Sequence, residues 1–265
     1  MSEELGDLIG AVRTYLQVHG RGRQFATGDW EPIPRGVSPE ALASSPSEVP
    51  EPSPELPAES TPTEPHVAFS VVSGSADLDA APDMDALRAL WGDCLRCPLA
   101  AGRQHLVFGE GAVPAGLMFV GEGPGEQEDL QGRPFVGRAG ELLTRMIEAM
   151  GLSRDRVFIA NIVKCRPPGN RDPEPGEVTA CLPVLQAQIR LVRPRVLVSL
   201  GRISAQTLLQ TATPISRLRG RWQRFGGVDL MPTFHPAYLL RSPEKKKEAW
   251  QDLQQVMERL REPHA

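Results

Sequence analysis

The large apolar residues of this chain gather in short runs in its C-terminal two thirds. Four such runs lie at residues 116–121, 156–161, 195–200 and 228–234. The first three are nearly continuous and rich in Val, Ile or Phe, which is typical of strands that are buried on both faces. The pattern therefore predicts four strands in the middle of a layered domain.

Helical spacing of apolar residues fills the intervals between these runs. Helices are predicted at residues 83–91, 139–150, 175–191, 204–210 and 243–260. Strands that alternate with helices indicate a parallel sheet covered on both faces. We therefore expect an α/β protein, a three-layer α/β/α domain with a mainly parallel four-stranded sheet. In such a domain the carboxyl ends of the strands form the ligand site.

The N-terminal third has a different character. Residues 1–28 include one amphipathic stretch, residues 5–18, which predicts a short helix that either binds a protein partner or packs back on the domain. Residues 29–82 are dense in Pro, Ser, Glu and Ala and predict a disordered linker, because they offer little apolar surface to bury. Residues 83–265 are expected to form the globular domain.

Charge separates the same regions. Residues 1–82 carry 4 Lys or Arg against 13 Asp or Glu, and residues 83–265 carry 25 against 20. A basic domain is compatible with a polyanionic partner, while the acidic tail either competes for that surface or keeps the protein soluble. We expect a cytoplasmic protein without membrane association, because no apolar run approaches the ~20 residues of a spanning helix and the first residues lack secretory-signal character. A monomer is expected as well.

Four cysteines remain to be explained in a reducing compartment, where disulfides are rare. They stand as Cys94-Leu-Arg-Cys97, then Cys165, then Cys181. A zinc site with four thiolates usually shows two close pairs, whereas the second pair here is widely spaced. The spacing favours a [4Fe-4S] cluster over zinc or buried free thiols, and the cluster would clip distant segments together.

A glycine-rich loop follows the first predicted strand. Residues 121–137 hold five glycines and the acidic residues Glu122 and Glu128, without the dinucleotide fingerprint or the lysine of a phosphate-binding loop. Alone, this loop is compatible with a purely structural turn.

Taken together, the motifs resemble one known family. They are Gly121-Glu-Gly-Pro-Gly-Glu126, Gly132-Arg-Pro-Phe-Val-Gly137, Asn161-Ile-Val-Lys-Cys-Arg166, the four cysteines and His235-Pro-Ala-Tyr-Leu-Leu-Arg241. In this order they resemble the family 4 uracil-DNA glycosylases, the iron-sulfur branch of that superfamily, over about residues 88–257. The resemblance implies an enzyme that flips uracil out of DNA, hydrolyses its N-glycosidic bond and starts base excision repair.

The resemblance also implies roles at the base. Phe135 would stack on the flipped uracil, and Asn161 would pair with its O4/N3 edge, since an amide offers both a donor and an acceptor. Gly123 would lie against the substrate at a position where several superfamily members carry Asp. His235 would donate a hydrogen bond to uracil O2 as negative charge develops there, as imidazole or imidazolium. Without the context of the motif, simpler interpretations are available. Asn161 would be a strand-end cap, Phe135 a loop anchor in the core, and His235 a structural histidine.

The resemblance also implies contacts to the DNA backbone and to the attacking water. The segment 236–241 is expected to be a loop that enters the minor groove, with Leu239 as a wedge and Arg241 on a phosphate. Since residue 123 is not Asp, Glu122 and Glu128 are the candidates for positioning water and for holding the pocket or favouring the sugar cation, with the roles not apportioned.

Three alternatives stay open. The basic stretch Arg217-Leu-Arg-Gly-Arg-Trp222 either binds phosphate or is a solvated turn. The chain could be a non-catalytic uracil-DNA binder, although it lacks a basic His-containing insertion between residues 161 and 178. It could also be an iron-sulfur electron carrier, which would leave the glycine-rich loop and the His235 segment without a purpose.

Overall fold

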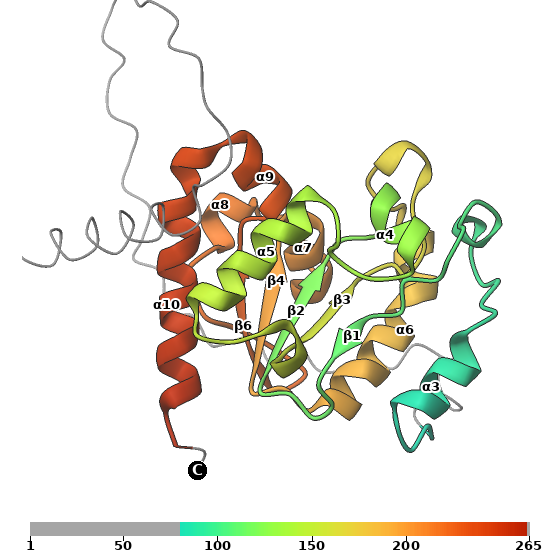
Figure 1. Cartoon of the computed structure of the whole chain (residues 1–265), viewed down its shortest axis with the longest axis horizontal. Coiled ribbons are helices and arrows are strands. Elements are labelled where there is room, and N and C mark those ends of the chain that lie inside the picture. The colour runs from blue at the N-terminus through green and yellow to red at the C-terminus, as the bar shows by residue number, and fades with distance from the viewer. Residues whose placement is uncertain (1–79, 264–265) are drawn as a thin grey trace, which may run out of the picture. The chain divides into compact units, whose positions relative to one another are not determined.

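The protein is described by a computed structural model over residues 80–263. The helix expected at residues 5–18 and nearly all of the expected linker lie outside this range. Figure 1 shows the arrangement of the described elements.

The centre of the domain is a six-stranded sheet with the order β1-β3-β2-β4-β6-β5. Its four inner strands are parallel neighbours: β3 (Phe158–Asn161), β2 (Leu117–Gly121), β4 (Val196–Leu200) and β6 (Val228–Thr233). These are the four strands that the apolar runs predicted, and the first three are buried along their whole length.

The expectation of only four strands was incomplete. Two short strands, β1 (Glu110–Gly111) and β5 (Gln223–Phe225), pair antiparallel with β3 and β6 at the two edges of the sheet. They are too short and too polar to produce an alternating or continuous apolar pattern, so only their pairing makes them strands.

Helices cover both faces of the sheet, which confirms the three-layer α/β/α prediction (Figure 1). Successive residues of a strand point to opposite faces. Thus Met118 and Val120 pack in one apolar cluster with α3 (Met84–Trp91), α6 (Pro175–Val192) and α7 (Arg202–Leu209). Leu117 and Phe119 pack in the other, with α5 (Arg138–Ala149) and α10 (Lys246–Arg261).

The five predicted helices are α3, α5, α6, α7 and α10, with ends within about two residues of the expectation except at the start of α10. Short elements complete the description: α4 (Glu126–Gln131), α8 (Ile215–Leu218), α9 (Pro236–Arg241), and the 3-10 turns η1 (Pro98–Ala101), η2 (Arg154–Arg156), η3 (Pro168–Asn170) and η4 (Pro243–Lys245). None of the helices in residues 80–263 is both long and apolar enough to cross a membrane.

The segment 236–241, expected to be a loop, is the short helix α9. Its start has two helix-favouring features, namely Pro236 at the first helical position and the His235 side chain, which accepts a hydrogen bond from the backbone N–H of Ala237. The prediction of a loop at residues 236–241 was therefore wrong, because these residues form a helix.

Candidate functional site at the carboxyl edge of the sheet

A pocket of about 450 Å³ opens at the carboxyl ends of the parallel strands. This is the edge at which an open parallel sheet places its ligands. Its lining includes seven of the residues singled out from the sequence, namely Glu122, Gly123, Glu128, Phe135, Asn161, His235 and Arg241. The fold thus brings together residues from the ends of β2, β3 and β6, and the set from Glu122 to Arg241 spans more than a hundred positions of the chain.

Asn161 ends β3 and contributes its amide group to the pocket lining. The residue is 1% exposed, and within the described structure neither Nδ2 nor Oδ1 has a hydrogen-bond partner. A buried amide without partners costs free energy, on the order of 1–3 kcal/mol per unsatisfied group. A ligand that offers both an acceptor and a donor would remove that cost.

Phe135 lies beside this amide. A Cβ placed on Gly121 would lie 2.3 Å from Asn161 Oδ1 and 2.5 Å from Phe135 Cζ, so the absence of a side chain at the end of β2 lets the two groups meet. The Phe135 and His235 rings face each other at 5.6 Å between centroids, tilted by 33°. An aromatic face, an amide and an imidazole therefore converge on one space.

The imidazole of His235 has a defined hydrogen-bonding role. Its Nδ1 accepts the backbone N–H of Ala237 at 3.1 Å, which assigns the proton of the neutral ring to Nε2. Burial, with a smaller effect from the charge of Arg241, lowers the pKa of His235 to about 4. With this pKa the ring is a neutral Nε2–H donor at neutral pH, which favours the imidazole over the imidazolium alternative.

Glu122 and Glu128 have different environments. Burial raises the pKa of Glu122 to about 7, with a further increase from the charge of Asp172 and an opposing effect of Arg202. A carboxyl group with this pKa can exchange a proton near neutral pH.

Glu128, by contrast, is occupied by backbone contacts. Its Oε1 accepts the N–H groups of Val136 and Gly137, both at 2.9 Å, and its Oε2 accepts that of Gly125 at 3.1 Å. The carboxylate ties the start of α4 to the turn that leads into α5. This geometry is that of a residue that holds the wall of the pocket.

Gly123 has a steric reason to lack a side chain. A Cβ there would lie 2.8 Å from Val163 Cγ2, with Pro167 close behind. An Asp at this position would require the Val163 side chain to shift.

Arg241 and Leu239, which were both expected to contact DNA, differ in exposure. Arg241 is exposed and lines the pocket. Leu239 is only 1% exposed and packs with Leu142, Phe234 and Ala249 in a small core cluster beneath α9. This burial is at odds with the expectation of an exposed wedge, because the helical turn of α9 directs residue 239 inward; Leu240, next in the chain, is partly exposed.

The comparisons with known proteins agree with this geometry. A family model described as the uracil DNA glycosylase superfamily matches residues 108–254. The chain belongs to the uracil-DNA glycosylase superfamily. The resemblance seen in the sequence motifs is thereby confirmed, and the matched region contains all of the pocket residues named above.

Three similar proteins carry the name type-4 uracil-DNA glycosylase. The protein of Sulfurisphaera tokodaii is 46% identical over 174 residues, which are 62% of this chain and 79% of the relative. That of Thermotoga maritima is 48% identical over 153 residues, 56% of this chain and 79% of the relative. That of Pyrobaculum aerophilum is 45% identical over 179 residues, 64% of this chain and 91% of the relative.

The four cysteines of this superfamily member all touch the apolar cluster beneath α3 and α6. Cys165 and Cys181 are buried, and Cys94 and Cys97 are partly buried. The charges of Cys94 and Cys97 both contribute to the raised pKa of Cys165, after the larger effect of burial, so the thiols are electrostatic neighbours. Within residues 80–263, however, no three or more His, Cys, Asp or Glu side chains are arranged as a metal site.

Hydrogen-bond donors point at two of these sulfur atoms. The backbone N–H of Lys164 donates to Cys181 Sγ, and Arg103 Nη1 donates to Cys165 Sγ, both at 3.3 Å. Arg103 also donates to the carbonyl of Cys94 at 2.6 Å, which ties the Cys94 segment to the end of β3. N–H groups directed at sulfur favour thiolates and are one means by which proteins tune iron-sulfur clusters.

Sequence reasoning missed several pocket residues. Asp172 and Arg202 form an ion pair at 2.5 Å, and both influence the pKa of Glu122. Tyr238 lines the pocket from α9. Isolated polar residues on loops and short helices carry no spacing signal, so only the fold reveals them.

The basic stretch of residues 217–222, which begins in the last turn of α8, contains arginines in different environments. Arg219 binds Asp252 in α10 through a two-pronged ion pair and donates to the carbonyl of Glu248 at 2.5 Å. Arg217 and Arg221 are exposed. Phosphate binding therefore stays open for those two residues, whereas Arg219 has a partner inside the protein.

Proposed function

We propose that this protein is a uracil-DNA glycosylase that flips uracil out of DNA and hydrolyses its N-glycosidic bond, leaving an abasic site that starts base excision repair. The observation that carries the proposal is the amide of Asn161, which is buried in the pocket lining and has no partner within the described structure. Membership of the superfamily and the type-4 relatives supply independent support.

Base selection follows from the atoms that Asn161 presents. The amide Nδ2–H donates to uracil O4 and Oδ1 accepts from N3–H, while Phe135 stacks against the ring. Cytosine offers the opposite pattern at this edge, so its binding would leave both amide groups mispaired. Each unpaired group costs ~1–3 kcal/mol, which is enough to discriminate strongly in a closed pocket.

Bond cleavage moves charge toward the base. As the bond between N1 of uracil and C1′ of the sugar breaks, its electron pair leaves with the base and spreads onto O2. His235 donates Nε2–H to that oxygen as a neutral imidazole, a stronger contact in the transition state than in the ground state. Its Nδ1 is held by Ala237, so the ring keeps its orientation during the reaction.

Water completes the hydrolysis. The carboxylate of Glu122 orients a water molecule toward C1′ and stabilises the positive character of the sugar; the water oxygen bonds to C1′ and its proton passes to the carboxylate. Glu128 acts on the loop rather than on the water, because its two oxygens already accept three backbone N–H groups.

On the DNA backbone, the exposed Arg241 at the pocket rim is suited to a phosphate. Insertion of Leu239 into the base stack would require it to leave its core cluster, so the partly exposed residues of α9, Tyr238 and Leu240, are better placed to contact DNA.

The four cysteines fit a [4Fe-4S] cluster as a structural clip. The donor set is suitable, because four thiols border one apolar cluster and two of them already accept N–H hydrogen bonds. Burial, opposed by the charge and the backbone N–H of Lys164, raises the pKa of Cys181 to about 12, so a bound cation would be needed to keep this residue as a thiolate. A cluster bound there would join the segment after α3 to the end of β3 and to α6. Zinc remains the alternative for the same ligands.

Iron and acid-labile sulfide, measured on anaerobically purified protein, decide between these metals. About four of each per chain, with visible absorption that is lost in Cys165→Ser, is the expected result. One zinc per chain and no sulfide would replace the cluster by a zinc site, and metal-free protein of full stability would overturn both.

The glycosylase proposal is tested with a labelled duplex that contains one uracil. Wild-type protein is expected to produce alkali-sensitive abasic sites, and His235→Ala to do so roughly 100- to 1000-fold more slowly, the usual cost of losing one donor to a developing anion. A wild-type protein that binds uracil-DNA without ever cleaving the glycosidic bond would instead be a non-catalytic binder.

We further propose a cytoplasmic location, a monomeric state and a protein partner for residues 5–18. Gel filtration coupled to light scattering tests the second directly.

A further inference from the structure

Phe135 has a backbone conformation that a bulky residue rarely adopts. Its φ is +52°, in the left-handed region that favours glycine. Such a conformation persists only when surrounding contacts impose it, and it is found most often at functional sites. The surrounding contacts must therefore hold Phe135 in this conformation.

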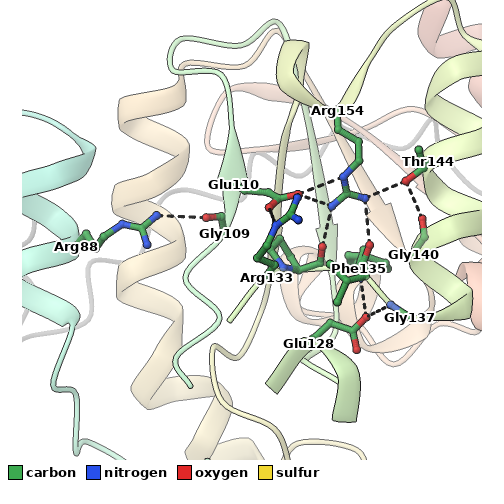
Figure 2. A network of polar contacts seen from close by, with 12 residues as sticks. Arg88, Gly109, Glu110, Glu128, Arg133, Phe135, Gly137, Gly140, Thr144 and Arg154 are labelled. Atoms are coloured by element: carbon green, nitrogen blue, oxygen red, sulfur yellow. Dashed lines mark hydrogen bonds and ion pairs between the residues drawn. The ribbon is translucent and has the colours of Figure 1, made fainter. Parts of the chain in front are cut away.

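Arg154, at the start of η2, makes several of these contacts (Figure 2). Its Nη1 donates to the carbonyl of Phe135 at 3.1 Å and its Nη2 to the carbonyl of Pro134 at 2.8 Å. The same guanidinium donates to Thr144 Oγ1 in α5 at 3.1 Å. One side chain thus holds two consecutive carbonyl groups and α5 together.

Glu110 orients the guanidinium. Its Oε1 accepts from Arg154 Nη2 at 2.5 Å and from Nε at 3.2 Å, and the pair is largely shielded, with side-chain exposures of 19% and 23%. A second arginine, Arg133, binds the same carboxylate from the solvent side, at 2.8 Å and with a side-chain exposure of 59%. Arg133 therefore shares the anchor of Arg154 but makes none of its contacts to the Phe135 backbone.

Two further features fix the other sides of this segment. A Cβ on Gly140 would lie 1.9 Å from the Phe135 carbonyl oxygen, so glycine at this position lets α5 approach the peptide. Glu128 accepts the N–H groups of Val136 and Gly137, as Figure 2 shows for Gly137. Hydrogen bonds thus hold the carbonyl groups of Pro134 and Phe135 and the N–H groups of Val136 and Gly137.

We propose that Arg154, anchored by Glu110, is a positioning residue of the base pocket: it holds the Phe135 backbone in its left-handed conformation and thereby sets the ring opposite His235, where the base stacks. This inference deepens the proposed glycosylase function and rests on it. Arg154 does not line the pocket and acts only through Phe135.

The test compares Arg154→Met with the matched control Arg133→Met, each in the wild-type and in a Phe135→Ala background. The readouts are the single-turnover rate of uracil release and, separately, the dissociation constant for uracil-DNA. Arg154→Met is expected to slow release roughly tenfold with little change in DNA binding, Arg154→Lys to restore part of the rate, and Arg133→Met to leave it unchanged.

The Phe135→Ala background separates positioning from general stability. Without the ring, Arg154→Met should produce no further loss, because the two residues act in series. An equal loss in both backgrounds, or equal effects of the two arginine substitutions, would overturn the proposal while leaving the glycosylase function intact.

A second readout does not depend on activity. Fluorophenylalanine is incorporated, and the ¹⁹F signal of Phe135 is assigned by its absence in Phe135→Leu. We expect Arg154→Met to shift or broaden this signal and Arg133→Met to leave it in place. An unchanged signal in Arg154→Met would overturn the inference, whereas a wild-type protein without uracil release would count only against the proposed function.

Discussion

Glu122 and His235 show how one pocket gives two ionisable side chains opposite protonation behaviour. Burial disfavours the charged form of either group, so it raises the pKa of the carboxyl group to about 7 and lowers that of the imidazole to about 4. The histidine is consequently neutral throughout the physiological range, and the glutamate is the group that titrates within it.

This difference predicts the pH dependence of the reaction. The carboxylate of Glu122 is the active form, so kcat/KM should fall as the pH is lowered through about 7, with little contribution from His235 above pH 5. Glu122→Gln should be slower and should lose this titration. A wild-type profile that is flat between about pH 6 and 8, or a Gln variant that keeps the same midpoint, would contradict the role assigned to Glu122.

At the scale of elements, the glycine-rich connection between β2 and α5 is organised by Glu128. Glu128→Gln keeps one acceptor oxygen and replaces the other by a donor, so either Gly125 or the Val136–Gly137 pair loses its partner. A partly buried, charge-assisted contact of this kind contributes about 1–2 kcal/mol.

We therefore expect Glu128→Gln to lower both the thermal midpoint and the turnover rate. The pH midpoint of kcat/KM should stay where Glu122 sets it, which distinguishes a loop role from a water role. A Glu128→Gln variant with normal stability but a shifted pH profile would indicate that Glu128 positions the water.

The helix α9 is a second element whose role depends on which face it buries. Because Leu239 packs with Leu142, Phe234 and Ala249, Leu239→Ala should reduce the free energy of unfolding by about 2–4 kcal/mol, measured by denaturant titration. Leu240→Ala serves as the control, since that side chain is partly exposed. Loss of uracil-DNA binding in Leu239→Ala at unchanged stability would restore the wedge interpretation.

At the scale of the whole molecule, a buried ionic network fastens α10 to the sheet. Asp252 is fully buried and accepts from Thr233 Oγ1 at the end of β6 and from Arg219. Removal of Arg219 would leave this carboxylate only partly compensated, which is strongly destabilising in buried pairs.

Arg219→Ala should accordingly lower the unfolding free energy by roughly 3 kcal/mol while leaving the salt dependence of DNA binding unchanged. Arg221→Ala, at an exposed position, should leave the stability unchanged. A reduced salt slope in Arg221→Ala would identify a phosphate contact there, and a reduced slope in folded Arg219→Ala would refute the structural role of Arg219.

The sequence by itself determined the layers of the domain, because burial on both faces imposes an apolar run on every inner strand and helical spacing on every covering helix. It also determined which segments meet, since the motifs that begin at Gly121, Asn161 and His235 each stand at the carboxyl end of a strand, and parallel strands bring such ends to one edge. That is why seven of the residues that line the pocket could be named in advance.

Only the tertiary structure decided what each of those residues does. The loop role of Glu128, the burial of Leu239 and the internal pairing of Arg219 depend on partners distant in the chain, and β1 and β5 become strands only through the neighbours they pair with. Likewise, the pKa values of Glu122 and His235 arise from burial in a pocket built by separate elements. Local sequence specifies periodicity and residue chemistry, whereas hydrogen-bond partners and desolvation are properties of three-dimensional neighbours.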